Sequence, residues 1–330
     1  MNEAKQVGRG LVADIGGTNS RFAVAADGAI SEPVKFACAD FQDMKAAIEA
    51  YLEFSSVEAS DLNWAVLAVA GPVDGDEVHM TNHAWRIKGS EIADAFGWTR
   101  ASVVNDFTAL ACSTPALTRE HLKPLGGGSA RANAGIITTA IVGAGTGLGV
   151  GGLVRGAFGV APLTTEGGHT SFAPLDDIER AVNAALLTRF ERVSNERLLS
   201  GPGLVNLYWA LGQAAGVQTD EIEPAEVTAR AIAGSDQLAV DTIAMFARML
   251  GAFTGDLVLS YGARGGAYIA GGLVPAMRDI FDGAAFRARF EAKGRFREYM
   301  ESVPVWLVTD PFAALTGAAV FGAAVWGAEP

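Results

Sequence analysis

Cysteine is scarce in this sequence. Cys38 and Cys112 are the only two among 330 residues, and no CxxC pair occurs. Thiol–disulfide motifs and zinc ribbons are built on such pairs, and disulfide-stabilised secreted domains need many more cysteines. We therefore expect two buried thiols that pack as small apolar side chains, in a protein of the reducing cytoplasm without a structural zinc.

Basic residues are also few. The sequence has 25 Lys and Arg against 37 Asp and Glu, for a formal net charge of −12. Because so acidic a surface is repelled by nucleic acids and anionic membranes, neither is expected as a partner. A small phosphorylated ligand remains compatible with this charge, since backbone N–H groups and a magnesium ion bind phosphate locally.

Long hydrophobic segments are missing too. The uncharged stretch at residues 136–154 contains six glycines, and each glycine costs a helix about 1 kcal/mol relative to alanine. We expect a strand, a loop and a second strand there. The uncharged tail at 311–327 is shorter than the ~20 residues of a membrane span and is expected to be a buried helix. Asp14 interrupts the apolar run near the N-terminus, so no signal peptide is expected.

Two common catalytic motifs, G-x-x-x-x-G-K-[ST] and H-E-x-x-H, are absent, so the sequence indicates neither a P-loop enzyme nor a zinc protease of that type. A glycine-rich loop between two predicted strands, LVADI and SRFAVA, is present instead. Its adjacent glycines allow positive φ, and its N–H groups can bind an anion. An ordinary hairpin turn has the same pattern. The candidate ligands of this first loop are Asp14, which can hold Mg²⁺ through water, and Gly16, Gly17, Thr18 and Asn19.

A second glycine-rich loop occupies residues 143–149. A dinucleotide-binding fingerprint would open a helix, whereas VGGLV after this loop reads as a strand, so we reject that interpretation. Two strand–loop–strand elements can together clamp the phosphates of a nucleotide. The candidate residues of the second loop are Gly143, Gly145, Thr146 and Gly147.

The arrangement around the two loops predicts two lobes of one α/β fold. A glycine hairpin followed by further strands and helices occurs twice, about 125 residues apart, which is too far for a solenoid repeat. Strands are expected at 34–37, 64–70, 101–104, 136–142, 150–154, 266–270 and 303–308, and helices at 41–54, 107–112, 176–190, 203–215, 224–232 and 236–259.

Three further groups of polar residues are candidates for chemistry. Asn105 and Asp106 follow a predicted strand, where Asp106 is either a helix cap or a general base for phosphoryl transfer. Glu166 and His169 flank two glycines, as in a ligand site or in a plain glycine turn. Glu196 carries no signal on its own, because it can simply pair with the next residue, an arginine.

Eight segments together resemble the bacterial ATP-dependent glucokinases of the hexokinase type. They are DIGGTNSRFA, MTNHAW, VNDFTA, GAGTGLGV, EGGH, SGPGLVNLY, IAGGLVP and FRARFEAKGRF, and they occur in the order and spacing of that family. The resemblance covers nearly the whole chain and implies an α/β fold of the two-lobed actin/hexokinase-like (ribonuclease H-like) type with an interdomain cleft. It implies a small α/β domain at 1–117 plus 311–330 and a large α+β domain at 118–310.

The resemblance also implies a role for each candidate. The two loops would hold the phosphates of ATP, and Gly271 and Gly272 would lie beside its adenosine. Asp106 would be the catalytic base towards the 6-hydroxyl of D-glucose, and Asn82 would lie near the sugar. The implied sugar ligands are Asn105, Asp106, Glu166, His169 and Glu196. The expected cofactors and partners are ATP, Mg²⁺ and D-glucose, in a cytoplasmic homodimer that starts glycolysis.

Three rival functions stay open. A kinase for mannose or fructose would carry similar motifs. A sugar sensor that regulates transcription would need a basic DNA-binding module, which a net charge of −12 disfavours. An actin-like or Hsp70-like ATPase would have no use for EGGH and VND.

Overall fold

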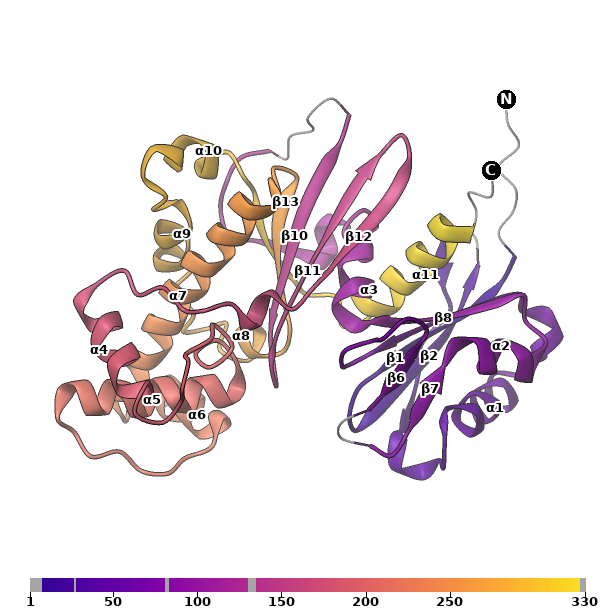
Figure 1. Ribbon diagram of the computed structural model, residues 1–330, viewed down its shortest axis with the longest axis horizontal. Helices are drawn as coiled ribbons and strands as arrows, with labels where there is room; N and C mark the ends of the chain where they lie inside the picture. The colour runs from indigo at the N-terminus through magenta and orange to yellow at the C-terminus, as the bar shows by residue number, and fades with distance from the viewer. Residues whose placement is uncertain (1–7, 27, 81–82, 130–134, 327–330) are drawn as a thin grey trace. The chain divides into compact units, whose positions relative to one another are not determined.

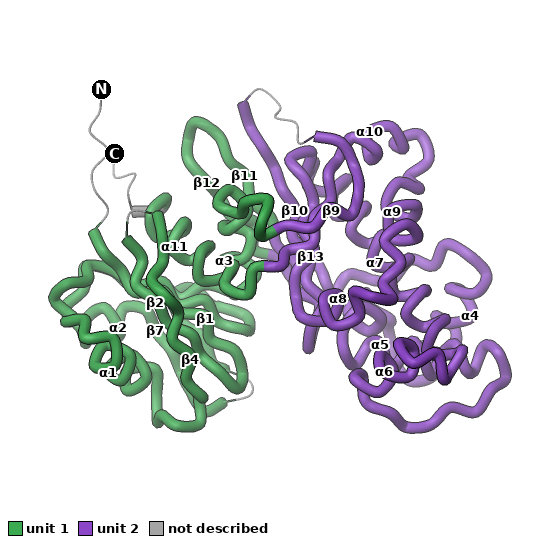
Figure 2. Tube along the Cα trace, turned by 180° about the vertical axis from the view of Figure 1, so that it is seen from behind, with its two compact units in different colours: residues 1–121, 152–164, 310–330 green, residues 122–151, 165–309 purple. Residues whose placement is uncertain are grey.

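The computed structural model describes residues 8–26, 28–80, 83–129 and 135–326. The chain divides into two compact units, coloured green and purple in Figure 2. The first consists of Met1–His121, Gly152–Thr164 and Asp310–Pro330, and the second of Leu122–Gly151 and Thr165–Thr309. The predicted domains differ from these units in that they assign residues 118–121, 152–164 and 310 to the larger one.

A six-stranded sheet forms the centre of the first unit (Figure 1). Its order is β3-β2-β1-β5-β8, and β4 pairs with β2. β1 runs antiparallel to β2 and parallel to β5, which in turn runs parallel to β8. The strands are β1 (Gly10–Ile15), β2 (Asn19–Ala26), β3 (Ala29–Ile30), β4 (Val34–Ala37), β5 (Trp64–Val69) and β8 (Arg100–Asn105), and a separate ribbon consists of β6 (Glu77–His79) and β7 (Arg86–Lys88).

Both faces of this sheet are buried, which explains the wholly apolar strand β5. Alternate residues of a strand point to opposite faces. Leu67 therefore packs in a core with helices α1 and α2, whereas Val66 packs in another core with α3 and α11. Every residue of β5 is buried as a result. The helices are α1 (Met44–Ser55), α2 (Gly89–Phe96), α3 (Asp106–Ser113) and α11 (Ala313–Trp326).

The second sheet repeats the plan of the first. Its order is β12-β11-β10-β13-β14-β9. A glycine-rich loop again joins the two adjacent strands β10 and β11, and β13 and β14 again continue the sheet in parallel from β10. The repetition predicted from the sequence is confirmed in this strand order. The strands are β9 (Leu122–Pro124), β10 (Ile137–Ala144), β11 (Leu148–Gly156), β12 (Gly159–Thr165), β13 (Gly266–Ala270) and β14 (Val305–Val308).

Helix α7 (Gln237–Tyr261) lies in the core of the second unit. In the described part of the chain it is the one helix long and apolar enough to cross a membrane. However, 72% of its most apolar 18-residue segment is buried inside the protein. A β-carbon on Gly251 would lie 2.1 Å from the carbonyl oxygen of Phe286, so this glycine lets helix α9 approach closely. The other helices of the unit are α4 (Asp177–Leu186), α5 (Gly201–Ala215), α6 (Pro224–Ala233), α8 (Leu273–Ala276), α9 (Gly283–Glu291) and α10 (Arg297–Glu301).

Most of the predicted elements are confirmed, including strands β10 and β11 in the uncharged stretch and a helix near the C-terminus. Both cysteines are free and buried, as expected. Helix α1 begins at Met44 and not at residue 41, because the Asp43 carboxylate accepts the N–H of Ala46 and caps the helix there.

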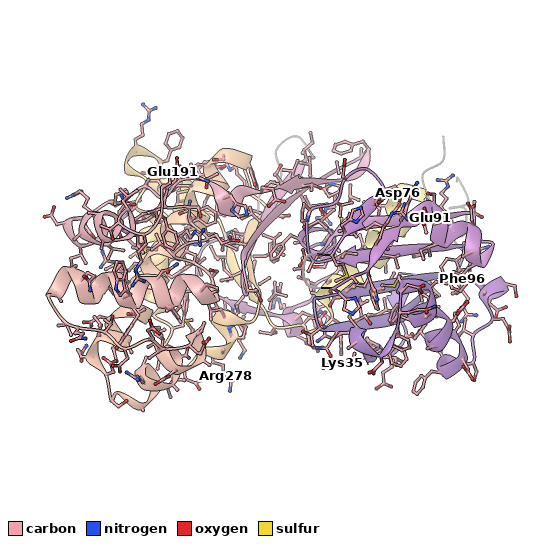
Figure 3. All side chains as sticks on the ribbon, turned by 60° about the horizontal axis from the view of Figure 1, so that its bottom comes forward. Lys35, Asp76, Glu91, Phe96, Glu191 and Arg278 are labelled. Carbon is pink, nitrogen blue, oxygen red and sulfur yellow. The ribbon has the colours of Figure 1, made fainter. Side chains whose placement is uncertain are left out.

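Charged side chains lie on the outside of both units. Figure 3 labels Lys35 and Glu91 of the first unit and Glu191 and Arg278 of the second, and all four are exposed. With 37 acidic against 25 basic residues in the sequence, the solvated surface is predominantly acidic.

Candidate functional site

In the first unit, the predicted site residues gather at one edge of the sheet. Parallel strands end at the same edge, and Ile15 of β1, Val69 of β5 and Asn105 of β8 are register partners there. The first glycine loop follows β1, and Asp106 follows β8. In open α/β sheets, ligands bind at the carboxyl ends of the strands, so this edge is the candidate site of the unit.

The first glycine loop is a short turn between β1 and β2. It is closed by a hydrogen bond from the N–H of Gly16 to the carbonyl of Asn19, 2.9 Å long. The expected positive φ is wrong here, because neither Gly16 nor Gly17 adopts it. Thr18 is exposed at the tip, and its carbonyl accepts the N–H of Cys38 at 2.9 Å. These glycines therefore do not adopt left-handed backbone conformations. Their lack of a side chain leaves the backbone of the turn accessible to a ligand.

Asp14 lies opposite Arg21 on the neighbouring strand. Nη1 of Arg21 is 3.2 Å from Oδ2 of Asp14, so the other carboxylate oxygen, Oδ1, is not used by this ion pair. Burial raises the pKa of Asp14 above its ordinary value, and the nearby Arg21 opposes that rise. In the described residues no group of three or more His, Cys, Asp or Glu is placed to hold a metal. A single carboxylate still fits Mg²⁺, which proteins commonly bind through one or two carboxylates, water and substrate phosphates.

Asn105 and Asp106 form the junction between β8 and α3. Asn105, and not Asp106, is the helix cap: its Oδ1 accepts the N–H of Phe107 at 2.9 Å. Its Nδ2 donates to the carbonyl of Gly71 at 3.0 Å, which fixes the amide orientation. Asp106 is the first residue of α3 and is half-buried, with Oδ1 3.0 Å from the N–H of Phe107. A carboxylate in this position is favoured by the helix dipole.

In the second unit, the second loop and the predicted adenosine turn lie side by side. Gly143 of β10 is the register partner of Ala270 of β13, so both turns follow the carboxyl ends of adjacent parallel strands. Gly271 has φ +82°, and a β-carbon there would lie 2.4 Å from the carbonyl oxygen of Ala144. Only glycine permits this conformation together with this approach. Gly272, the next residue, precedes helix α8 and is exposed.

The second loop is also attached to the start of helix α5. The N–H of Gly201, the first helical residue, donates to the carbonyl of Gly145 at 2.7 Å. Ser200 caps the helix by accepting the N–H of Gly203 at 3.0 Å, and its hydroxyl donates to the carbonyl of Glu196 at 2.8 Å. Thr146 is exposed at the tip of the loop, available to a ligand.

Glu166, His169 and Glu196 come together beside this loop. Nε2 of His169 lies 3.9 Å from Oε2 of Glu166, and its Nδ1 lies 3.7 Å from Oε1 of Glu196. The Glu166 and His169 side chains are exposed by 69% and 53%, and that of Glu196 by 30%. Oε2 of Glu196 accepts the N–H of Leu148 at 3.0 Å. The His169 imidazole thus lies within 4 Å of both carboxylates, and Glu196 in turn bonds the glycine loop, as the sequence alone did not require.

Sequence reasoning missed several residues that hold this cluster. Arg192 donates to the carbonyl of His169 at 2.7 Å, and Ser200 and Gly201 connect Glu196 to the loop. Ser200 was detectable, since a serine shortly before a proline is a helix-start signal. Nothing in the pattern pointed to Arg192 or to the backbone of Leu148. Asn82 lies outside the described residues.

Comparison with known proteins gives consistent matches. A family model described as glucokinase matches residues 11–325. The chain is 43% identical over 324 residues to a glucokinase of Caulobacter sp. (strain K31), with 97% of each chain covered. It is 44% identical to a glucokinase of Aromatoleum aromaticum, covering 94% of this chain and 93% of that one.

Solved structures resemble the fold as well. The crystal structure of a glucokinase from an Antarctic psychrotroph is 36% identical and has a TM-score of 0.87, covering 95% of this chain and 98% of that one. A glucokinase of the ROK family from Streptomyces griseus, in complex with glucose and AMPPNP, shares the fold at 20% identity, with a TM-score of 0.60 over 95% of this chain and 99% of that one. The predicted α/β fold of the actin and hexokinase type is confirmed by these likenesses.

Proposed function

This chain belongs to the glucokinase family of ATP-dependent hexose kinases, and we propose on that premise that it transfers the γ-phosphoryl group of ATP to the 6-hydroxyl of D-glucose. The products are glucose 6-phosphate and ADP. The observation that carries the proposal is the convergence of Glu166, His169 and Glu196 beside the second glycine loop. A polar cluster suited to hydroxyl groups thereby adjoins a backbone suited to phosphate.

The sugar is recognised by complementary hydrogen bonding. Glucose hydroxyls both donate and accept, so the carboxylates of Glu166 and Glu196 accept from them, while the His169 imidazole donates or accepts according to its tautomer. Asn105 contributes through its amide, whose orientation is set by Gly71 and Phe107. A site that pairs every hydroxyl discriminates strongly against an analogue that lacks one.

Asp106 is the general base. Its carboxylate takes the proton of the 6-hydroxyl as the new oxygen–phosphorus bond forms and the bond from the γ-phosphorus to the bridging oxygen breaks, leaving ADP. In phosphoryl transfer the protein mainly positions the reactants and stabilises charge. The first turn of α3 supports this role, because it holds Asp106 at a defined place on a rigid element.

The two glycine loops bind the phosphates of ATP through backbone N–H groups. Residues 16–19 and residues 143–147 supply these donors, and Thr18 and Thr146 add hydroxyl groups. Gly271 and Gly272 lie along the adenosine. Asp14 would hold Mg²⁺ through water, and Arg21 keeps this carboxylate in place. When bound, the ion neutralises phosphate charge.

Further proposals concern the setting of the reaction. The enzyme acts in the cytoplasm in the first step of glycolysis, as a homodimer that binds neither nucleic acid nor membrane. The acidic composition supports the last point. The Streptomyces griseus structure, with glucose and AMPPNP bound, supports the choice of both substrates.

The test is a coupled assay of ADP release with a panel of hexoses. We expect glucose to have the highest kcat/KM, and a higher value for mannose or fructose would reassign the substrate. Asp106→Ala should still bind glucose, measured by calorimetry, but lose about 10²–10⁴-fold in kcat, the usual contribution of a general base. A near-normal kcat would remove Asp106 from this role, and ADP release without any sugar would favour a plain ATPase.

A further inference from the structure

The peptide group of Leu148, at the end of the second glycine loop, is bonded by the sugar-site candidate Glu196 on one side and closely approached by Gly168 on the other. Its N–H donates to Oε2 of Glu196 at 3.0 Å. Its carbonyl oxygen lies so close to Gly168 that a β-carbon on that glycine would be 2.0 Å away. Leu148 itself is 4% exposed, so its N–H has little access to water as an alternative partner.

The carboxylate of Glu196 is divided between two partners. Oε2 accepts a hydrogen bond from the N–H of Leu148 in the loop, while Oε1 faces Nδ1 of His169 at 3.7 Å. Gly147 makes this arrangement possible, because a β-carbon there would lie 2.7 Å from Oε2. A single carboxylate therefore lies against the glycine loop on one side and against the proposed sugar ligands on the other.

The backbone around Glu196 leaves it little freedom to move independently. Its N–H donates to the carbonyl of Gly168 at 2.9 Å, and its carbonyl accepts the hydroxyl of Ser200. Gly201, next to that serine, donates to Gly145 in the loop. The segments that carry Gly168, Glu196 and the loop are thus connected by main-chain bonds as well as by the carboxylate.

We propose that Glu196 is a positioning residue that couples sugar binding to nucleotide binding. A sugar held by Oε1 and His169 immobilises the carboxylate, and the same carboxylate orders the N–H of Leu148 and the loop before it. Once one ligand has borne the entropic cost of ordering the loop, the second binds a site that is already ordered. Such coupling is reciprocal, so the nucleotide tightens glucose to the same extent. This inference rests on the proposed function of both sites.

The chain offers a matched pair of variants. Gly147→Ala places a methyl group against Oε2 and displaces the carboxylate, whereas a β-carbon on Gly145 meets nothing within 4 Å. Neither glycine has a positive φ, so alanine fits the backbone at both positions. The two variants make the same chemical change in the same loop, and only one touches Glu196.

The experiment measures the Kd of AMPPNP with magnesium by calorimetry, with and without saturating glucose. In the unmodified enzyme we expect glucose to lower this Kd by about 5-fold or more, the lower end of usual coupling. Gly145→Ala should keep that ratio even where it changes the Kd itself, and Gly147→Ala should lose it. Equal ratios in the two variants would overturn the proposal.

Hydrogen exchange of the unmodified enzyme gives a second readout that needs no variant. Glucose alone, without nucleotide, should slow amide exchange in the peptide spanning residues 143–149. Unchanged exchange together with no effect of glucose on the Kd would refute the coupling. Glucose-dependent ADP release would in that case still support the glucokinase reaction, whereas its absence would refute the proposed function itself.

Discussion

Ser200→Ala tests how the start of helix α5 supports the site. The Ser200 hydroxyl accepts the N–H of Gly203 and donates to the carbonyl of Glu196, and the side chain is 2% exposed. Losing a helix cap costs about 1 kcal/mol. The Glu196 carbonyl then also loses a buried donor, which costs about 1–3 kcal/mol. We therefore expect the free energy of unfolding to fall by about 2–4 kcal/mol.

Equilibrium unfolding in urea, followed by circular dichroism, measures this loss. The control is Asp43→Ala, which removes a cap of the same kind from α1 in the first unit. It should cost about 1 kcal/mol and leave the KM for ATP unchanged. Ser200→Ala should in addition raise the KM for ATP, because Gly201 beside it bonds the carbonyl of Gly145. The reasoning would be refuted if the two variants lost the same free energy of unfolding and the KM for ATP were unchanged in both.

Two more predictions concern the loop and the pH dependence of stability. Gly145→Val meets no protein atom near its β-carbon, so we expect its steric effect to fall on bound nucleotide, with the KM for ATP raised about 10-fold and that for glucose little changed; equal effects in steady-state assays would contradict this. Partial burial raises the pKa of Asp176, but the N–H of Glu179 and the charges of Arg248 and Arg289 outweigh it, so the pKa lies below the ordinary value. The ionised Asp176 carboxylate therefore stabilises the folded state. This contribution is fully present above the ordinary pKa near 3.8, and it is lost as the pH falls through the lower pKa of the folded state. Asp176→Asn should therefore be less stable than the unmodified protein at pH 7 in urea, by a margin that shrinks below about pH 4; a margin independent of pH would contradict the assignment.

The sequence predicted those strands and helices whose buried residues form a strong apolar pattern. β5 and β13 are short and apolar, a glycine follows each within two residues, and both occur where expected. β12 was not predicted, because GVAPLTT contains a proline, which weakens a strand pattern, and lacks a continuous apolar run. Helix α2 was not predicted either, because it has only eight residues and begins at a glycine.

The site was less predictable than the fold. Glycine loops and a carboxylate after a strand are visible as local patterns, but the bond from Leu148 to Glu196 joins residues 48 positions apart. Such a contact depends on how three segments pack, and a backbone N–H leaves no trace in residue type. The glycine pattern suggested positive φ angles, but neither Gly16 nor Gly147 has one, and Gly147 is needed because a β-carbon there would lie 2.7 Å from Oε2 of Glu196.

The first unit is assembled from three separate stretches of chain, and this has a consequence for protein synthesis. Helix α11, which covers Val12, Val66 and Ala68 of the sheet, comes from the last stretch. During translation, at roughly 5–20 residues per second, the strands leave the ribosome long before this helix does. The apolar face that α11 shares with α3 therefore stays only partly covered until α11 has been synthesised, and exposed apolar surface of this kind makes a nascent chain prone to aggregation.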